Sequence, residues 1–158
     1  METLLLSDHC PDDIQRAGDI LRRGGLVAIP TETVYGLAAN ALDGEAVKKI
    51  YQAKGRPSDN PLIVHISRFS QLAPLVREVP ESAQKLAAAF WPGPLTIILP
   101  KSDVIPQQTS GGLDTVAVRC PSHPTARAVI DAAGVPLAAP SANLSGKPSP
   151  TTFLHVRE

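Results

Sequence analysis

Aromatic residues are scarce in this sequence, at 4% of 158 residues, and neither sign of charge dominates. Lysine plus arginine equals aspartate plus glutamate, at 15 each, so the formal net charge is zero. Proteins that bind nucleic acid over a broad face carry an excess of basic residues, and single-stranded RNA is commonly held on stacked aromatic rings. The composition therefore argues against a dedicated nucleic-acid-binding module, while a local basic pocket stays compatible with it.

Cysteine is also rare, and no long apolar run is present. Cys10 and Cys120 lie far apart, and neither belongs to a Cys-x-x-Cys pair that would indicate a zinc site or a redox centre. No apolar stretch approaches the roughly 18 residues of a membrane helix, and the N-terminus lacks the basic region of a signal peptide. We therefore expect two free thiols, no membrane attachment and a cytoplasmic location.

The rest of the composition is typical of one globular α/β domain. Apolar residues make up 43% of the chain, and 158 residues suffice for one domain with a buried core. Apolar β-branched runs alternate with stretches of helical periodicity. The predicted strands are 4–6, 26–29, 62–66, 95–99, 115–119 and 135–139. The predicted helices are one capped by Asp12 or Asp13, then 44–54, 68–77, 81–90 and 124–133, with a loop over 107–112.

Two threonines and a carboxylate follow the predicted strand 26–29, in the run from Pro30 to Leu37. Pro30 cannot donate a ladder hydrogen bond, so the strand should end there, and Gly36 suits a turn. Open α/β folds place ligand sites at the ends of sheet strands. The pattern predicts a ligand contact, although a threonine here would equally serve as a helix N-cap.

Two cations stand at the end of the predicted helix 44–54, on either side of a glycine. Lys54 supplies a point charge and Arg56 a planar fork of donors, which together suit a phosphate group. Residues i and i+2 of a helix diverge, so the two charges converge only if the chain leaves the helix at Gly55, where glycine permits the left-handed conformation. The alternative role for this pair is to complement the negative end of the helix.

Ser141 and Asn143 follow the predicted strand 135–139 at the spacing that shares one face of an extended chain. A hydroxyl and an amide would then point the same way, as in a ligand contact. The alternative is a local turn before Gly146, in which these side chains bond to their own backbone. A phosphate-binding P-loop is excluded, because Ser141 stands where its first glycine belongs and Pro148 where serine or threonine is needed.

Two ionisable side chains lie inside predicted strands. Arg119 ends the apolar strand 115–119, and a buried charge is rarely left unpaired. A bidentate bond to an amino-acid carboxylate would satisfy Arg119, and a salt bridge to Glu32 or Asp114 is the alternative. His65 stands among isoleucine and valine, where a histidine is more often part of the core than a ligand.

Three of these segments together resemble one protein family. Pro30 to Leu37, Lys54 to Ile66, and Pro140 to Gly146 occur in the order found in the Sua5/YrdC/YciO family. The likeness extends from about residue 12 to the C-terminus, and the second segment is closer to the Sua5 branch than to the shorter YrdC branch. It implies a YrdC-like α/β domain with a twisted sheet of parallel and antiparallel strands, flanked by helices.

The resemblance also implies an activity and its substrates. Enzymes of this family are threonylcarbamoyl-AMP synthases, which are nucleotidyltransferases acting on L-threonine, bicarbonate or CO2, and ATP, with Mg²⁺ accompanying the nucleotide. Their product serves the t6A modification of adenosine 37 in tRNA through a downstream t6A transferase complex. Contact with tRNA itself is expected to be weak or indirect, no membrane partner is expected, and a homodimer is an open expectation.

Site residues are carried over from the family by their position in the matching motifs. A catalytic role falls on Lys54, Arg56, Ser141 and Asn143. Contacts to L-threonine fall on Thr33, His65, Arg119 and Ser141. Contacts to ATP fall on Lys54, Arg56, Asn60, Thr115, Asn143 and Thr151. No residue is assigned as a metal ligand, and His65 is a candidate general base.

Two other functions stay open. One is a related carbamoyl-adenylate domain such as that of hydrogenase maturation factors, which sits in larger chains with acylphosphatase and zinc modules. The other is an RNA-binding module of the same fold without catalysis, which would show a steep salt dependence of tRNA binding. Family members continue past the residue at which this sequence stops, so 1–158 is expected to be a domain shortened at its C-terminal end, with low ATP turnover and a tendency to self-associate.

Overall fold

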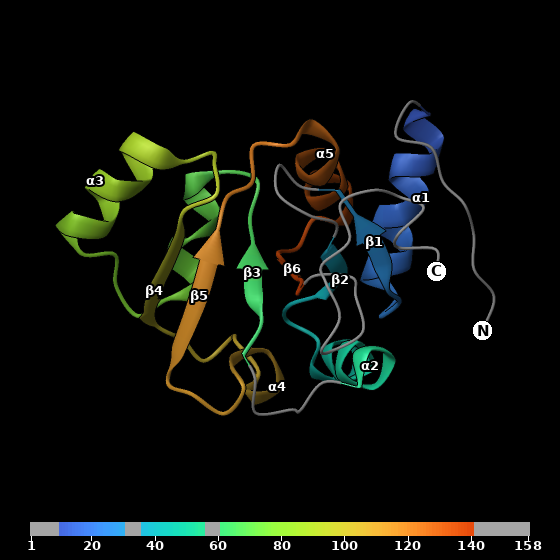
Figure 1. Cartoon of the computed structure of the whole chain (residues 1–158), viewed down its shortest axis with the longest axis horizontal. Coiled ribbons are helices and arrows are strands. Elements are labelled where there is room, and N and C mark those ends of the chain that lie inside the picture. Colours follow the sequence, from blue (N-terminus) through green and yellow to red (C-terminus); the bar gives the residue numbers. More distant parts are fainter. Residues whose placement is uncertain (1–9, 31–35, 56–60, 141–158) are drawn as a thin grey trace.

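Six short strands form one mixed sheet in the part of the chain that the structure describes. The computed structural model describes residues 10–30, 36–55 and 61–140. The strands are β1 (Val27–Ile29), β2 (Gly36–Asn40), β3 (Ile63–His65), β4 (Thr96–Pro100), β5 (Thr115–Arg119) and β6 (Leu137–Ala138). Their order in the sheet is β1-β2-β6-β3-β5-β4 (Figure 1). The β3–β5 pair is parallel and the other neighbouring pairs are antiparallel, which confirms the mixed sheet.

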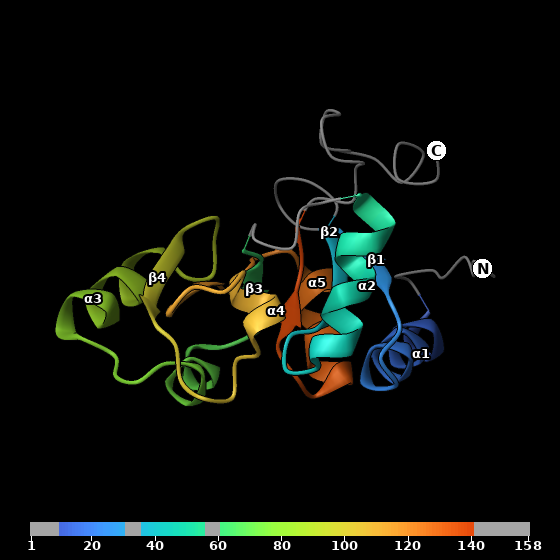
Figure 2. The ribbon, with the colours of Figure 1, turned by 90° about the horizontal axis from the view of Figure 1, so that it is seen from below.

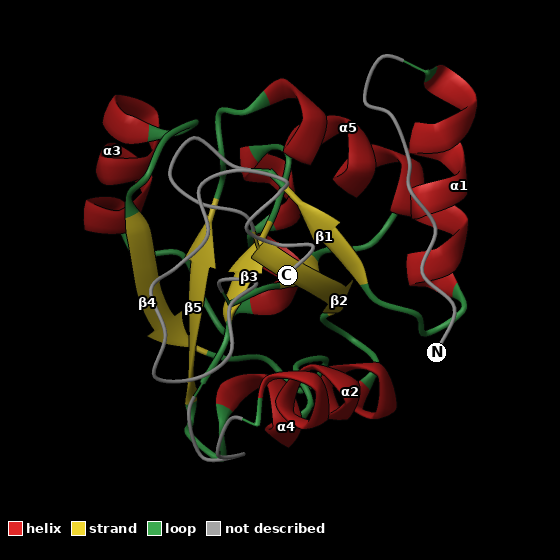
Figure 3. Cartoon of the chain, turned by 45° about the vertical axis from the view of Figure 1, so that its right-hand side comes forward, coloured by secondary structure: helices red, strands yellow, loops and turns green. Residues whose placement is uncertain are grey.

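Helices surround this sheet. The bounds are α1 (Pro11–Arg22), α2 (Gly44–Lys54), α3 (Glu81–Phe90), α4 (Gln107–Ser110) and α5 (Pro124–Ala133), with 3₁₀ turns η1 (Phe69–Gln71) and η2 (Ala73–Leu75). The helices α1 and α5 pack on each other, and α2 packs on α4 (Figure 3). Seen from below, α3 lies at one end of the molecule and α1 at the other (Figure 2).

Several helix and strand ends lie where their sequence signals placed them. Asp43 caps α2, where its Oδ1 accepts hydrogen bonds from the backbone nitrogens of Glu45 at 3.1 Å and Ala46 at 3.3 Å. Gly55 ends α2 in the left-handed conformation, with φ of 65°. The strand β1 ends at Ile29, directly before Pro30. These ends depend on local chemistry, which explains why the sequence predicts them.

Two of the predicted helix assignments are wrong. The cap of α1 is Cys10, and Asp12 and Asp13 lie in the first turn, where their charges favour the helix N-terminus. The predicted helix 68–77 is replaced by η1 and η2, because Pro74 has no backbone N–H for continuing a helix.

Two elements were not predicted at all. The predicted loop 107–112 contains the short helix α4, which begins after Pro106 and ends at Gly111 with φ of 63°. Gly36 does not form a turn but opens β2, where its Cα pairs with that of Ile29. The predicted strand 4–6 lies outside the described residues. The small side chains of β2 explain the omission, because they give no β-branched signal.

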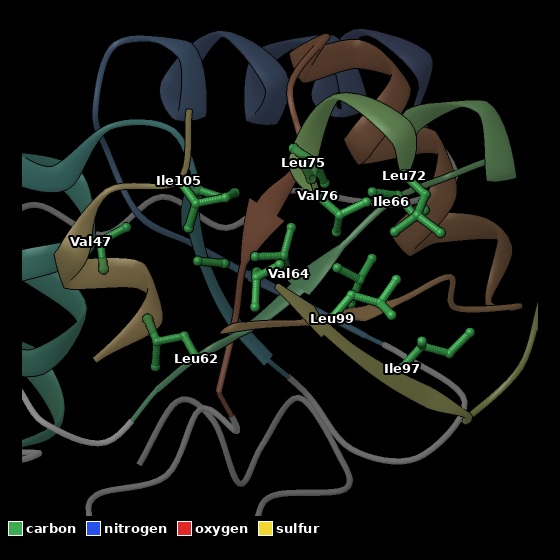
Figure 4. Packing of buried hydrophobic residues seen from close by; sticks show 14 of the residues in the cluster. Val47, Leu62, Val64, Ile66, Leu72, Leu75, Val76, Ile97, Leu99 and Ile105 are labelled. Atoms are coloured by element: carbon green, nitrogen blue, oxygen red, sulfur yellow. The ribbon is translucent and has the colours of Figure 1, made fainter. Parts of the chain in front are cut away.

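The core consists of two clusters of buried apolar side chains. The larger cluster joins α2, the 3₁₀ turns and α3 to the central strands, and Figure 4 shows Val64, Leu99 and Leu72 among its members. The smaller cluster joins α1 and α5 to β1, β2 and β6, with Leu21 and Ile130 fully buried. Val116 and Val118 of β5 belong to the larger cluster, so by the alternation of a strand Thr115, Ala117 and Arg119 face the other way.

Gly18 sets the close contact between α1 and α5. A Cβ atom at this position would lie 2.6 Å from the backbone carbon of Ala132, which cannot move aside as a side chain can. Alanine in a helix interior ordinarily stabilises by about 1 kcal/mol relative to glycine. We expect Gly18→Ala instead to lower the free energy of unfolding by about 1–2 kcal/mol, because the two helices must separate. Urea unfolding measures the change.

The exposed Arg16→Ala variant in the same helix serves as the control for Gly18→Ala. We expect it to change the free energy of unfolding by less than about 0.5 kcal/mol. A stabilised Gly18→Ala variant would show that the packing of α1 on α5 tolerates a methyl group.

Candidate substrate-binding site

The described flanks of the three sequence motifs meet at one place in the sheet. The backbone N–H of Leu37 donates to the carbonyl of Pro140 at 2.9 Å, and the N–H of Ala139 donates to the carbonyl of Ile63 at 3.0 Å. A Cβ atom on Gly36 would lie 3.3 Å from the Cβ of Ala139. The described residues that flank the three motifs therefore lie side by side in the sheet, although they are far apart in the sequence.

Much of the predicted site lies outside the described residues. This holds for Thr33, Arg56, Asn60, Ser141, Asn143 and Thr151, for the side chain of Lys54, and for Glu32. Their roles stay predictions. The described part of the predicted site consists of His65, Arg119 and Thr115.

His65 and Arg119 end two neighbouring parallel strands, β3 and β5. Their Cα atoms are paired in the register, so both side chains start from the same face of the sheet. The backbone N–H of Ile66 donates to the carbonyl of Arg119 at 2.9 Å and continues the pairing past His65. The structure thus brings together His65 and Arg119, the two described residues among the four that were assigned to L-threonine.

His65 is held by the backbone of its own sheet. Its side chain is buried, with 3% of the residue exposed, and Nδ1 lies 3.1 Å from the carbonyl oxygen of Ile63. A carbonyl oxygen only accepts, so Nδ1 carries the proton. Burial lowers the pKa of His65 from 6.5 to about 4, against the raising effect of hydrogen bonds to the backbone of Ile63 and Leu137. His65 is therefore neutral at pH 7 and poorly suited as a base there, which favours the core role.

The low pKa of His65 links folding to pH. The unfolded chain binds a proton on this residue below about pH 6.5, while the folded chain stays neutral until about pH 4, so acidification favours unfolding between these values. From pH 7 to pH 5 we expect His65 to remove about 2 kcal/mol of stability. The measurement is the free energy of unfolding at both pH values for the wild type and His65→Gln. An equal pH dependence in both proteins would contradict a buried, neutral His65.

Arg119 is buried too, with 8% of the residue exposed, and its Nε donates to the carbonyl of Gly93 at 3.4 Å. Burial lowers the pKa of its guanidinium from the ordinary value. The alternative ion pair with Asp114 does not fit, because Asp114 precedes the opposite end of β5, about 16 Å along an extended strand. The loop at Gly93 is itself fixed, since its N–H donates to the carbonyl of Cys120 at 2.8 Å.

Thr115 lies away from this pair. It begins β5, which places it about 13 Å from Arg119 along the strand and two residues before Ala117, the partner of Ile63 at the start of β3. Thr115, one of the six residues assigned to ATP, thus lies at the opposite end of the β3–β5 pair from His65 and Arg119. Thr115 and Arg119 start from the same face of β5.

One residue beside Arg119 was missed in the sequence. Thr96 in β4 pairs with Arg119 across the antiparallel β4–β5 ladder, so its hydroxyl starts from the same face, and the residue is partly exposed. The alternation of the predicted strand 95–99 could have indicated an outward position for Thr96. Its neighbour in space could not be predicted, because that depends on the pairing of two strands.

Both cysteines are free thiols, as predicted, and burial raises the pKa of Cys120 against the lowering effect of the nearby Arg127 charge. Within the described ranges, no group of three or more histidine, cysteine, aspartate or glutamate side chains could hold a metal ion. Across the same ranges, no helix combines the length and apolar character needed to cross a membrane.

The fold and the meeting of these three motifs define a YrdC-like α/β domain. Residues 19–158 match the model of the Sua5/YciO/YrdC family, which is described as telomere recombination. This chain belongs to that family.

Relatives and solved structures agree with this membership. The chain is 61% identical over 145 residues to a threonylcarbamoyl-AMP synthase of Pyrococcus abyssi, and these cover 92% of this chain and 43% of the relative. It is 60% identical over 152 residues to the Bacillus subtilis protein of the same name, covering 96% and 44% respectively. The crystal structure of P. abyssi Sua5 complexed with L-threonine matches with a TM-score of 0.92 and 60% identity, covering 93% of this chain and 43% of that one. The chain thus spans less than half the length of these relatives.

Proposed function

We propose that this chain forms threonylcarbamoyl-AMP from L-threonine, bicarbonate and ATP. The observation that carries the proposal is the meeting of the described flanks of three separate motifs, at Leu37, Ile63 and Pro140. Relatives at 60% identity or more are named for this activity, and one of them was crystallised with L-threonine. The chain spans less than half of those proteins, so activity and substrates are proposed for it here.

The proposed roles follow the charges of the substrates. Arg119 holds the carboxylate of L-threonine through its planar fork, with Thr96 beside it as a further hydroxyl donor. Lys54 and Arg56 hold the triphosphate, and Ser141 and Asn143 orient the reacting groups. The proposal also includes two further contacts to L-threonine, from Thr33 and Ser141. It includes four further contacts to ATP, from Asn60, Thr115, Asn143 and Thr151. His65 supports the sheet under the threonine subsite, because its Nδ1–H is already engaged by the carbonyl of Ile63.

The proposed reaction asks for positioning more than for covalent catalysis. The deprotonated amine of L-threonine attacks CO2, which forms from bicarbonate by loss of hydroxide, and gives a carbamate. A carbamate oxygen then attacks the α-phosphorus of ATP, and the bond from that phosphorus to pyrophosphate breaks. Charge neutralisation and alignment of the two reactants supply most of the acceleration in such transfers. Mg²⁺ would neutralise phosphate charge, and none of the steps assigned to this chain depends on it.

The wider setting belongs to the proposal as well. The product would pass to a t6A transferase complex that modifies adenosine 37 of tRNA, with weak or indirect contact between this chain and tRNA. A cytoplasmic location and a homodimer are part of the same proposal. Light scattering tests the homodimer, and a monodisperse monomer would contradict it.

The assay is pyrophosphate release from ATP and bicarbonate with each of the twenty amino acids in turn. Among the twenty amino acids, we expect only L-threonine to raise pyrophosphate release above background, and the other nineteen amino acids to have little effect. Background release with every amino acid, together with tRNA binding that weakens steeply as salt rises, would favour the RNA-binding alternative. Release that does not depend on any amino acid would favour the related carbamoyl-adenylate domain.

A further inference from the structure

Four hydrogen bonds tie the short helix α4 to other parts of the chain. Thr109 is fully buried and donates through Oγ1 to the carbonyl of Ala41, directly after β2, at 2.7 Å. Ser110 is 1% exposed, and its Oγ accepts from Nζ of the buried Lys101, at the end of β4, at 2.9 Å. A buried ammonium group is rarely tolerated without such a bond. Two side-chain hydrogen bonds therefore fix α4 to the sheet.

The same helix holds the chain on both sides of residues 55–61. The hydroxyl of Tyr51, in the last turns of α2, donates to the carbonyl of Gln108 at 2.7 Å. The N–H of Leu62, just before β3, donates to the carbonyl of Thr109 at 3.0 Å. Tyr51 is 6% exposed and Leu62 is 2% exposed, and α2 and α4 lie side by side in Figures 1 and 3. Two adjacent carbonyls of one helical turn thus receive both ends.

We propose that α4 is a positioning element that fixes the separation of Gly55 and Pro61. Tyr51 lies four residues before Gly55, and Leu62 directly follows Pro61, so holding both on one turn of α4 leaves little freedom in that separation. This inference rests on the proposed function, in which Lys54 and Arg56 contact the triphosphate. A displacement of a charged contact by about 1 Å can weaken catalysis strongly. A fixed separation of Gly55 and Pro61 would therefore help to keep Lys54 and Arg56 in position against the triphosphate. Tyr51 and Thr109 are therefore positioning residues for ATP.

Tyr51→Phe removes the hydroxyl but keeps the ring that fills the core, and Thr109→Val removes the hydroxyl that anchors α4. The matched control is Ser102→Ala, which also removes one hydroxyl hydrogen bond to a backbone carbonyl, that of Pro74, at 2.7 Å. The first readout is hydrogen exchange of the Leu62 amide in the ligand-free chain. We expect exchange about threefold to tenfold faster in Tyr51→Phe and Thr109→Val, and unchanged in Ser102→Ala.

The second readout is calorimetric binding of ATP and of L-threonine. We expect ATP binding about threefold to tenfold weaker in Tyr51→Phe, with L-threonine binding unchanged. If Tyr51→Phe leaves both the exchange of the Leu62 amide and the ATP affinity unchanged, this inference is overturned and the proposed function is untouched. The same holds if Tyr51→Phe weakens the binding of ATP and L-threonine equally, or if Ser102→Ala weakens ATP binding as much as Tyr51→Phe does. If the wild type binds no ATP but the Leu62 amide exchanges faster in Tyr51→Phe and Thr109→Val, the proposed function is overturned. The role of α4 in positioning Gly55 and Pro61 would then still be supported.

Discussion

Arg119→Ala is expected to weaken L-threonine binding by about 30-fold to 5000-fold and to leave ATP binding nearly unchanged. Truncating one partner of a buried charge pair removes about 2–5 kcal/mol, because the other charge is left desolvated without its partner. Arg119 is 8% exposed, so water in the Arg119→Ala variant would solvate the threonine carboxylate poorly in place of the lost guanidinium. Isothermal titration with each ligand measures the two affinities separately.

Arg119→Lys and Arg77→Ala serve as controls for this prediction. Lysine keeps the charge without the planar fork, so we expect Arg119→Lys to recover a small part of the lost affinity. Arg77 is exposed, and its removal should change neither affinity. A lower ATP affinity with retained threonine affinity would reverse the assignment of Arg119. Unfolding of Arg119→Ala at room temperature would show instead that Arg119 serves the fold, through contacts such as that with the Gly93 carbonyl.

Arg56→Ala is expected to lower adenylate formation by at least tenfold. One charge-assisted hydrogen bond to a phosphate contributes roughly 1.5–3 kcal/mol, which corresponds to about a tenfold to 150-fold change in rate. The prediction comes from the spacing of Lys54, Gly55 and Arg56, and the helix ends at the left-handed Gly55, as this spacing requires. The rate of threonine-dependent pyrophosphate release measures the effect.

Lys48→Ala is the control for a lost positive charge in the same helix, away from its C-terminal end. Lys48 lies on α2 with its Nζ 3.1 Å from Oε1 of Glu45, and its side chain is half exposed. Such surface pairs contribute little, so we expect pyrophosphate release close to that of the wild type. An unchanged rate in a folded Arg56→Ala variant would remove Arg56 from the site.

Local chemistry let the sequence predict most of the elements and the family. Asp43 and Gly55 mark the ends of α2, and Pro30 and Pro124 mark a strand end and a helix start, because each acts on its own or adjacent backbone groups. The apolar runs of β3, β4 and β5 were recognisable because β-branched residues pack well in a half-buried sheet. The three motifs were recognisable because the residues within each are close in the sequence.

Tertiary structure decided which of these residues meet. The pairing of His65 with Arg119, and of Thr96 with Arg119, comes from the β3-β5-β4 order, which no local signal contains. The polar run 107–112 looked like a loop, and α4 forms because Thr109 and Ser110 find buried partners, Ala41 and Lys101, directly after β2 and β4. His65 could have been a ligand or part of the core, and its burial beside backbone carbonyls favours the core. The sequence therefore determined the family and the chemistry of the motifs, whereas non-local pairing determined how the described residues are placed around the candidate site.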